Sequence, residues 1–242
     1  MNPPPGNAEF DPFAADYDAA LACGLRLAGE DRDFFARGRV AWLARCLRDH
    51  KKNIRAVLDF GCGDGAATAL LQQLAENPSV TGVDVSPASL AVARERHAAE
   101  QVTFCAPDEL GAGARFDLAF CNGVFHHIPP AERPAALARV FAALRPGGWF
   151  ALWENNPWNP GTRLIMRRVA FDRDAVLLWP VTARRLLRAA GFVVRRTDFR
   201  FIFPRWLRGL RPLETPLHRL PLGGQYQVLA QKPAFPAPPG GR

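Results

Sequence analysis

The sequence predicts an α/β fold of three layers, in which helices cover both faces of a mostly parallel β-sheet. Short apolar runs, typical of buried strands, alternate along the chain with segments of high helical propensity. A glycine-rich turn follows the first of these runs, as it does where a parallel sheet binds a ligand. The chain has 242 residues, of which 48% are hydrophobic, and this is enough for the core of one domain.

The first strand and its turn occupy residues 54–65. Residues 54–60 are mostly apolar, and a helix-forming run follows at 66–73. Between them stand three glycines at alternate positions, Gly61, Gly63 and Gly65. Glycine is needed in such a turn because the backbone takes positive φ angles and lies close to the ligand. The segment therefore predicts a cofactor site at the carboxyl end of the sheet.

Two kinds of ligand fit this turn. With Ala66 in the last place, the glycines also satisfy the relaxed dinucleotide fingerprint G-x-G-x-x-G/A. A pyrophosphate at a helix N-terminus favours N–H donors without nearby anions, however, and here Asp59 and Asp64 flank the glycines. These carboxylates suit a ligand with ammonium and sulfonium charges better, unless they only cap the following helix.

The remaining elements follow in alternation. The second strand, from residue 79, ends in Asp84, about 20 residues beyond the glycines, where a carboxylate can accept both ribose hydroxyls. Pro87 starts a helix that continues over 88–99, and Gly191 ends another helix over 182–190. The other predicted strands are 102–106, 116–123, 149–153, 192–197 and 226–232.

These segments closely resemble the class I S-adenosylmethionine-dependent methyltransferases, and within them a bacterial, type 11/12-like group. The matching motifs, in the family's order and spacing, are VLDFGCGDG, GVDVS, APD, FDLAFCNGVFHHI and LRPGGWFAL. The resemblance is close over residues 50–155 and more distant over 182–233. It implies a Rossmann-like sheet of seven strands in the order 3-2-1-4-5-7-6, with the last strand antiparallel. It also implies an enzyme whose cofactor is S-adenosyl-L-methionine.

The resemblance assigns roles to residues of the predicted cofactor site. The glycines approach the methionine part, with Asp59 nearby. Asp84 holds the ribose hydroxyls, and Asp108 holds the adenine amino group. Cys121 and Asn122 border the methionine end, mainly through their backbone. The expected cofactor-binding residues are Asp59, Gly61, Cys62, Gly63, Gly65, Asp84, Val85, Asp108, Cys121, Asn122 and Tyr17.

We expect one methyltransferase domain over residues 1–233. Residues 10–53 form an N-terminal helical lid, in which Tyr17 lies near the cofactor or serves packing alone. Residues 54–156 form the cofactor-binding core and residues 157–225 the substrate-side region. The tail 234–242 is rich in proline and glycine, and we expect it to be disordered.

Two adjacent histidines follow the fourth predicted strand at its carboxyl end. Adjacent residues on a turn point in different directions, so we expect only one of them to face the site. His127 aligns with a family histidine that is mostly structural, which leaves His126 as the candidate general base. The alternative is that His126 packs or shapes the substrate site. No carboxylate or thiol stands at ligand spacing around the pair, so no metal site is predicted.

Charge is divided unevenly between the two parts of the chain. Residues 1–156 hold 15 Lys and Arg against 19 Asp and Glu, whereas residues 157–242 hold 16 against 4, nearly all of the positive charge being arginine. An anionic acceptor or surface is one interpretation, and arginine as a general solubilising cation is the other. Candidate substrate-side residues are His127, Asn155, Asn156, Arg163 and Arg167. The asparagines are polar groups at the pocket mouth, or part of a turn with Pro157.

Residues 199–211 interleave aromatic side chains with arginines. This pattern suits a membrane interface, a stack of single-stranded nucleic acid bases, or a strand and loop packed on the core.

For the function we predict methyl transfer to an oxygen or nitrogen acceptor on a small-molecule, glycan or lipid-linked substrate. An RNA methyltransferase, favoured by the pI of about 9.9, and a cofactor-binding protein without catalysis are the alternatives.

The sequence predicts a cytoplasmic location. No basic segment followed by an apolar one opens the chain, and no apolar run reaches the ~18 residues needed to cross a bilayer. The five cysteines form no C-x-x-C pair, and we expect reduced thiols. Peripheral membrane contact is compatible with residues 199–211, nucleic acid is the less favoured partner, and no obligate protein partner is indicated.

Overall fold

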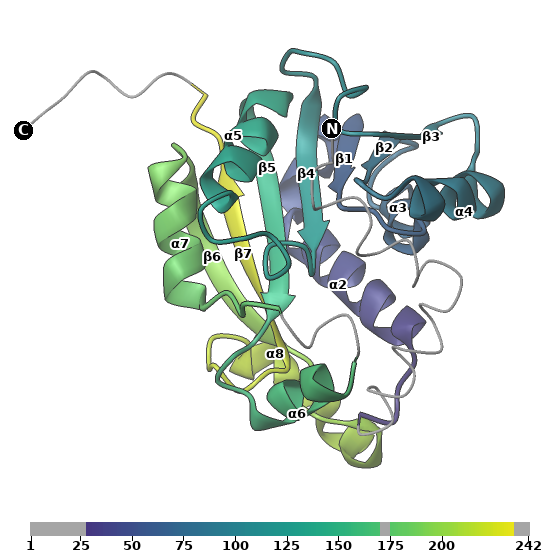
Figure 1. Cartoon of the computed structure of the whole chain (residues 1–242). Coiled ribbons are helices and arrows are strands. Elements are labelled where there is room, and N and C mark those ends of the chain that lie inside the picture. Colours follow the sequence, from purple (N-terminus) through teal and green to yellow (C-terminus); the bar gives the residue numbers. More distant parts are fainter. Residues whose placement is uncertain (1–27, 170–174, 235–242) are drawn as a thin grey trace, which may run out of the picture.

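The computed structural model describes residues 28–169 and 175–234, and its centre is a seven-stranded sheet (Figure 1). The strand order is β3-β2-β1-β4-β5-β7-β6. Strands β1 to β5 pair in parallel, whereas β7 runs antiparallel to both β5 and β6. The predicted order and the antiparallel last strand are thus confirmed. The strands are β1 Ala56–Phe60, β2 Ser79–Val83, β3 Val102–Cys105, β4 Phe116–Asn122, β5 Leu144–Asn155, β6 Val193–Arg200 and β7 Gln225–Gln231.

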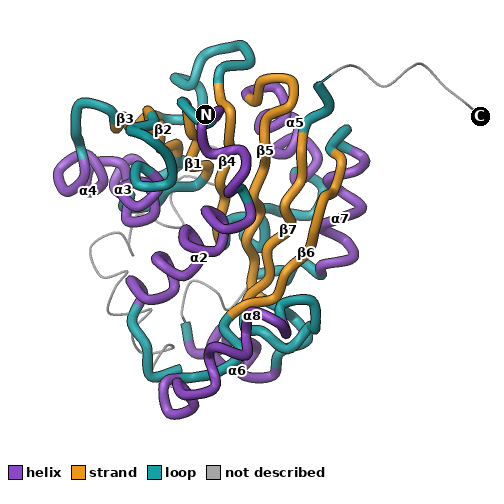
Figure 2. Tube along the Cα trace, turned by 180° about the vertical axis from the view of Figure 1, so that it is seen from behind, coloured by secondary structure: helices purple, strands orange, loops and turns teal. Residues whose placement is uncertain are grey.

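Helices cover both faces of this sheet (Figures 1 and 2). Side chains of β4 alternate between the two cores, as a strand buried on both faces requires. Ala119 and Cys121 pack with α5 and α7, whereas Leu118 and Phe120 pack with α2 and α3. The α-helices are α2 Arg32–Cys46, α3 Ala66–Leu71, α4 Pro87–His97, α5 Arg133–Ala143, α6 Pro160–Arg168, α7 Pro180–Ala189 and α8 Glu214–Leu217, and the 3-10 helices are η2 Arg48–Asn53 and η4 Arg205–Leu213.

Helix ends follow local capping rules. The side chain of Asp31 accepts a hydrogen bond from Phe34 N at the start of α2, and Ser86 accepts one from Ser89 N at the start of α4. Asn159 caps α6 in the same way, with Pro160 in the first turn. The sequence predicted no element for this segment, in which Pro157 indicated at most a turn.

The carboxyl ends of the parallel strands lie at one end of the molecule, together with α6, α8 and η4 (Figure 1). This end is where a parallel sheet places a ligand site. In the described part of the chain, no helix combines the length and apolarity needed to span a membrane. The four described cysteines, Cys46, Cys62, Cys105 and Cys121, are free thiols.

Candidate active site

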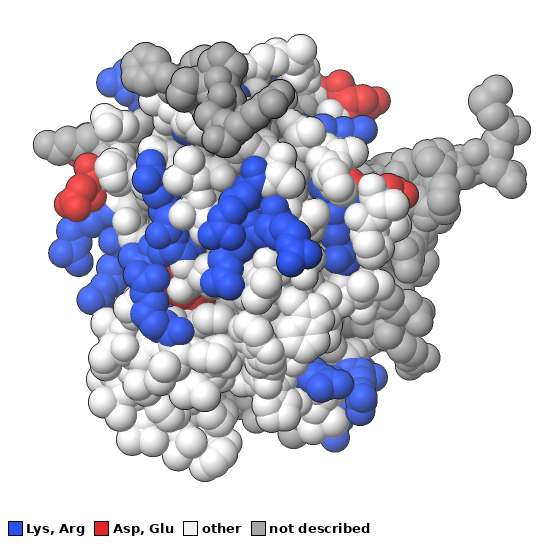
Figure 3. Space-filling view, turned by 90° about the vertical axis from the view of Figure 1, so that its left-hand side faces the viewer, with Lys and Arg blue, Asp and Glu red and all other residues white. Residues whose placement is uncertain are grey.

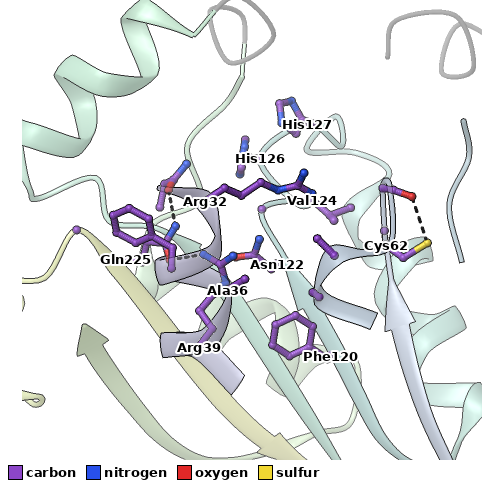
Figure 4. Close-up of a pocket in the computed structure, with 18 of the residues that line it drawn as sticks. Arg32, Ala36, Arg39, Cys62, Phe120, Asn122, Val124, His126, His127 and Gln225 are labelled. Atoms are coloured by element: carbon purple, nitrogen blue, oxygen red, sulfur yellow. Dashed lines mark hydrogen bonds between the residues drawn. The ribbon is translucent and has the colours of Figure 1, made fainter. Parts of the chain in front are cut away.

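A cavity of about 1090 Å³ lies over the carboxyl ends of β1, β2 and β4. The turns after these strands line one side of it, and α2, α6 and the segment leading into η4 line the other. Figure 4 shows Arg32, Ala36 and Arg39 of α2 facing Asn122 and Val124 across this space. The volume lies at the upper end of ligand sites, about 300–1,000 Å³, so the cavity has room for a cofactor and a small acceptor together.

The glycine turn gives the cavity its floor. Gly61, Gly63 and Gly65 all have positive φ angles, of 75°, 55° and 83°. A Cβ at Gly61 would stand 2.2 Å from Val124 Cγ2, whereas a Cβ at Gly63 would meet no atom within 4 Å. The backbone at Gly63 therefore faces open space, as a close approach to a ligand requires.

Asp84 follows β2 and organises this turn. Its Oδ2 accepts a hydrogen bond of 2.8 Å from Gly63 N, and its Oδ1 accepts one of 2.9 Å from Ser86 N. Asp84 and Val85 both line the cavity. The carboxylate therefore stands beside the glycine turn, where a nucleoside ribose would lie.

Asp59 is a buried carboxyl in the cavity wall, with 2% of its surface exposed. Its Oδ2 accepts a hydrogen bond of 2.6 Å from Thr68 Oγ1. Burial raises its pKa to about 7, and although the Thr68 bond lowers this value, the nearby Asp84 carboxylate raises it further. A cation beside Asp59 would stabilise its charged form, so this carboxyl fits the expected ammonium and sulfonium groups.

Asp64 differs from Asp59, contrary to the prediction that both flanking carboxylates serve a cationic ligand. Arg32 Nη1 donates a hydrogen bond of 2.6 Å to Asp64 Oδ2, and Arg96 Nη1 lies 3.7 Å from the same oxygen. Burial raises the pKa of Asp64, but the bonds and charges of these arginines outweigh it and hold the pKa below its usual value. The charge of Asp64 is thus compensated within the protein, and only Asp59 supports a cationic ligand.

A buried histidine–carboxylate pair stands at the other side of the glycine turn. His126 Nδ1 lies 2.5 Å from Glu154 Oε2, and Glu154 Oε1 accepts a hydrogen bond of 2.8 Å from Phe125 N. His126 is 3% exposed and Glu154 is 1% exposed. A proton on Nδ1 is donated to Glu154, which places the basic lone pair of the imidazole on Nε2. The pair therefore provides the geometry of an oriented general base.

His127 lies next to this pair. Its ring centroid is 4.1 Å from that of His126, and both side chains line the cavity. We expected only one of them to face the site. Both side chains face the cavity because the turn after β4 is tight, and in it His127 N donates a hydrogen bond of 3.0 Å to Val124 O.

The remaining predicted residues divide into those that line the cavity and those that do not. Asp108 is exposed and lies outside the lining, although its neighbour Pro107 belongs to it. Gly65 and Cys121 are buried behind the cavity wall. Tyr17 lies outside the described residues. The predicted residues that line the cavity are Asp59, Gly61, Cys62, Gly63, Asp84, Val85, Asn122, His126, His127 and Asn155.

Asn156, Arg163 and Arg167 do not line the cavity. Asn156 is buried, and its Nδ2 donates to the carbonyls of Pro221 and Gly223 over 3.1 and 2.7 Å. It thereby ties the end of β5 to the loop before β7, instead of standing at the pocket mouth. Arg163 and Arg167 lie on the exposed side of α6.

Several residues that line the cavity were not predicted from the sequence. Arg39 of α2 is buried in the cavity wall, and its Nη1 donates to Gln225 Oε1 over 3.0 Å. An aromatic wall consists of Phe34, Phe35 and Phe201, whose closest ring centroids are 4.9 Å apart. These three phenylalanines can be read from the sequence, but only the fold shows that Phe201 lies beside Phe34 and Phe35.

The thiol of Cys62 also lines this cavity. Burial raises the pKa of Cys62, with nearby Asp59 as a second cause, so this thiol is a poor nucleophile. No group of three His, Cys, Asp or Glu side chains within residues 28–169 and 175–234 is arranged to hold a metal ion.

Comparison with known proteins identifies the core of the chain. Residues 58–150 match a family model described as a methyltransferase domain. The chain is 32% identical over 125 residues to trans-aconitate 2-methyltransferase of Escherichia coli, and the alignment covers 51% of this chain and 48% of that protein. The match thus spans about half the length of these curated relatives.

Solved structures share the whole fold. A methyltransferase in complex with the Trm112 methyltransferase activator of Haloferax volcanii gives a TM-score of 0.63 at 17% identity, covering 95% of this chain and 98% of that one. Magnesium protoporphyrin IX methyltransferase from Synechocystis, with S-adenosylhomocysteine bound, gives 0.58 at 18% identity, covering 86% and 85%. The family model over residues 58–150, the seven-stranded sheet and the glycine turn together support a class I S-adenosylmethionine-dependent methyltransferase.

Proposed function

We propose that this protein transfers a methyl group from S-adenosylmethionine to an oxygen or nitrogen atom of a small-molecule acceptor. One observation carries the proposal. A single cavity joins the glycine turn, with Asp59 and Asp84, to the buried pair of His126 and Glu154. A cofactor site and a candidate base therefore share one space.

The residues around the glycine turn would hold the cofactor, which supplies an electrophilic methyl group on a sulfonium. Gly63 has the open backbone face that a bound methionine part needs, and Asp84 offers a carboxylate to the ribose hydroxyls. Asp59 balances the positive charge from within the wall. Asn122, at the end of β4, lines the cavity between these groups and His126.

His126 would accept the proton that the acceptor loses. Glu154 holds the imidazole in one orientation and tautomer through Nδ1, so that Nε2 receives the proton. Methyl transfer needs the acceptor atom in line with the bond that breaks, and positioning in a space closed to water supplies most of the effect. The aromatic wall of Phe34, Phe35 and Phe201 would orient the acceptor's apolar body.

An anionic acceptor is favoured by Arg39. This arginine is 6% exposed, and its guanidinium lies in the cavity wall, where it would bind a carboxylate. A relative that shares half of the chain is named for trans-aconitate, which is a carboxylate. Trans-aconitate is therefore the first acceptor to test.

Calorimetry and turnover together test the proposal. We expect S-adenosylhomocysteine to bind and NAD not to bind, and binding of NAD alone would refute the cofactor assignment. Labelled S-adenosylmethionine is then incubated with trans-aconitate and with fractionated cell extract. We expect S-adenosylhomocysteine to form with one of them. Its formation should fall when His126 is replaced by Ala if the acceptor is a hydroxyl or an amine that loses a proton, whereas an ionised carboxylate has no proton to lose and should not depend on His126. Cofactor binding without turnover on any fraction would instead support the non-catalytic alternative.

A further inference from the structure

The end of the molecule that holds the cavity also exposes large apolar side chains. We name this set the apolar rim: Trp158, Leu164, Trp206, Leu210, Leu213 and Leu222. Trp206 is 76% exposed, and the others are between 42% and 50% exposed. Side chains of this size rarely cluster on a solvent face without a partner.

The η4 segment contributes half of the rim and is amphipathic. Its sequence, RWLRGLRPL, alternates arginines with tryptophan and leucines, and none of its nine residues is buried. A segment that packs on the core would bury its apolar side. The apolar side chains of η4 are therefore accessible to another surface. Apolar residues flanked by arginines are typical of segments that lie in a membrane interface.

The charged side chains that η4 and α6 themselves expose are arginines, although Glu30 pairs with Arg211 of η4. Arg205 and Arg208 of η4 and Arg163 and Arg167 of α6 are exposed. In the described part of residues 157–225 the acidic residues are Asp198 and Glu214, and both are buried. Figure 3 shows that lysine and arginine side chains also gather across the face that carries α7, above the mostly uncharged lower end of the molecule. The rim therefore combines apolar contact with attraction to an anionic surface.

The rim borders the opening of the cavity. Trp206 and Arg211 of η4 and Ile165 of α6 line the cavity, whereas Leu164 and Leu210 on the same elements are exposed. Figures 1 and 2 agree that α6 and η4 lie at the same end of the fold. A surface that contacted the rim would thus lie against the cavity mouth.

We propose that the apolar rim and its arginines bind the surface of membranes that contain anionic lipids. The tryptophan and leucines enter the boundary between headgroups and acyl chains, and the arginines contact phosphates. Membrane binding stands independently of the proposed reaction. Where both hold, the acceptor is an amphiphile that reaches the cavity from the membrane.

Vesicle sedimentation tests this surface with the full chain, without cofactor or acceptor. We expect binding to vesicles of phosphatidylcholine mixed with phosphatidylglycerol, a fall in binding as salt rises, and weak binding to phosphatidylcholine alone. R205Q/R208Q should lower the partition coefficient by roughly thirtyfold, at about tenfold per 1.4 kcal/mol. W206S/L210S should lower it by at least about tenfold.

The matched control is R48Q/R55Q, which removes the same charge from exposed arginines beside the amino end of β1. We expect it to leave binding within about twofold, because only phosphates near the rim are contacted. Equal losses in R48Q/R55Q and R205Q/R208Q would overturn the proposal, since binding would then follow net charge alone. Binding to RNA without binding to vesicles would also overturn it. A dimer in light scattering that the W206S/L210S variant dissociates would do the same. Circular dichroism and melting temperature show that each variant is folded.

Discussion

Glu154 Oε2 lies 2.5 Å from His126 Nδ1, although the two residues come from different segments. Glu154 stands near the end of β5, and His126 stands in the turn after β4. The neighbouring pairing of β4 and β5, with Asn122 opposite Trp153, brings them together at the carboxyl end of the sheet. Glu154 also accepts a bond from Phe125 N, so it fixes the turn as well as the imidazole. Position and chemistry of the candidate base therefore depend on one buried carboxylate.

With an acceptor that loses a proton, such as a hydroxyl or an amine, replacing His126 by Ala should lower kcat by about 10²–10⁴-fold, because the variant loses the group that accepts the proton. Glu154→Gln should cause a smaller loss, since the amide still bonds to the turn but no longer favours the same tautomer. Turnover across a pH range measures both effects, with S-adenosylhomocysteine affinity expected to stay unchanged.

His127→Ala is the matched control, because His127 lines the same cavity while it is His126 Nδ1 that contacts Glu154. We expect a change in KM with little change in kcat. A larger loss of kcat in this variant than in His126→Ala would assign the base to His127. An unchanged pH profile in Glu154→Gln would leave Glu154 a purely structural role.

Asp84→Ala should weaken S-adenosylhomocysteine by at least about tenfold, because it removes a carboxylate that also accepts bonds from Gly63 N and Ser86 N. Asp108→Ala should weaken it less, since Asp108 is exposed beside the cavity. Calorimetry gives both affinities, and thermal melting separates a disordered turn from a lost ligand contact. A stronger effect at Asp108 would contradict the order of these two contributions.

The titration of Asp59 should be visible in stability and in binding. Its pKa is raised from 3.8 to about 7 in the folded protein, mainly by burial. The protonated carboxyl therefore stabilises the fold fully below pH ~4, and this stability is lost as pH rises through about 7. Asp59→Asn should gain stability relative to the natural protein between pH 5 and pH 8, by the order of a few kcal/mol.

Cofactor binding near pH 6 should release a proton, because a cation beside Asp59 favours its charged form. Calorimetry in two buffers with different ionisation enthalpies measures this release. Asp59→Asn is expected to bind without it. Equal proton release in both proteins would place the titrating group elsewhere.

The strands and the glycine turn were predictable because both are local. Apolar runs, proline and glycine positions and the charge of Asp84 all act within a few residues, and the family's spacing supplied the strand order. Boundaries were less accurate. β5 begins at Leu144, five residues before the predicted start, because β4 pairs with it from Phe116 onward despite a register shift. α6 was missed, although Asn159 and Pro160 form an ordinary helix start.

The site depended more on tertiary contacts. Arg39 stood on a helix that the sequence predicts, but its partner Gln225 is 186 residues away. Asn156 was predicted to lie at the pocket mouth or in a turn with Pro157. Its Oδ1 accepts a bond from Trp158 N in such a turn, and its Nδ2 satisfies carbonyls of a loop that no local pattern indicates. Arg163 and Arg167 follow the fifth strand closely in sequence, and this closeness says little about which side of α6 they occupy.

The arginines give the last prediction. If the acceptor is a soluble carboxylate, Arg39→Gln should raise its KM by about tenfold or more, because the variant loses a charged, buried donor in the cavity wall. Arg163→Gln with Arg167→Gln should leave KM within about twofold, since both side chains lie on the exposed face of α6 outside the lining. Steady-state kinetics with trans-aconitate, or with an acceptor found in extract, gives both values.

Arg39→Lys keeps the charge without the planar fork, and an intermediate KM for it would indicate bidentate binding. If Arg39→Gln leaves the S-adenosylhomocysteine affinity and the melting temperature unchanged, its effect is on acceptor binding alone. A larger rise of KM in the double α6 variant would show instead that the acceptor's charge meets α6.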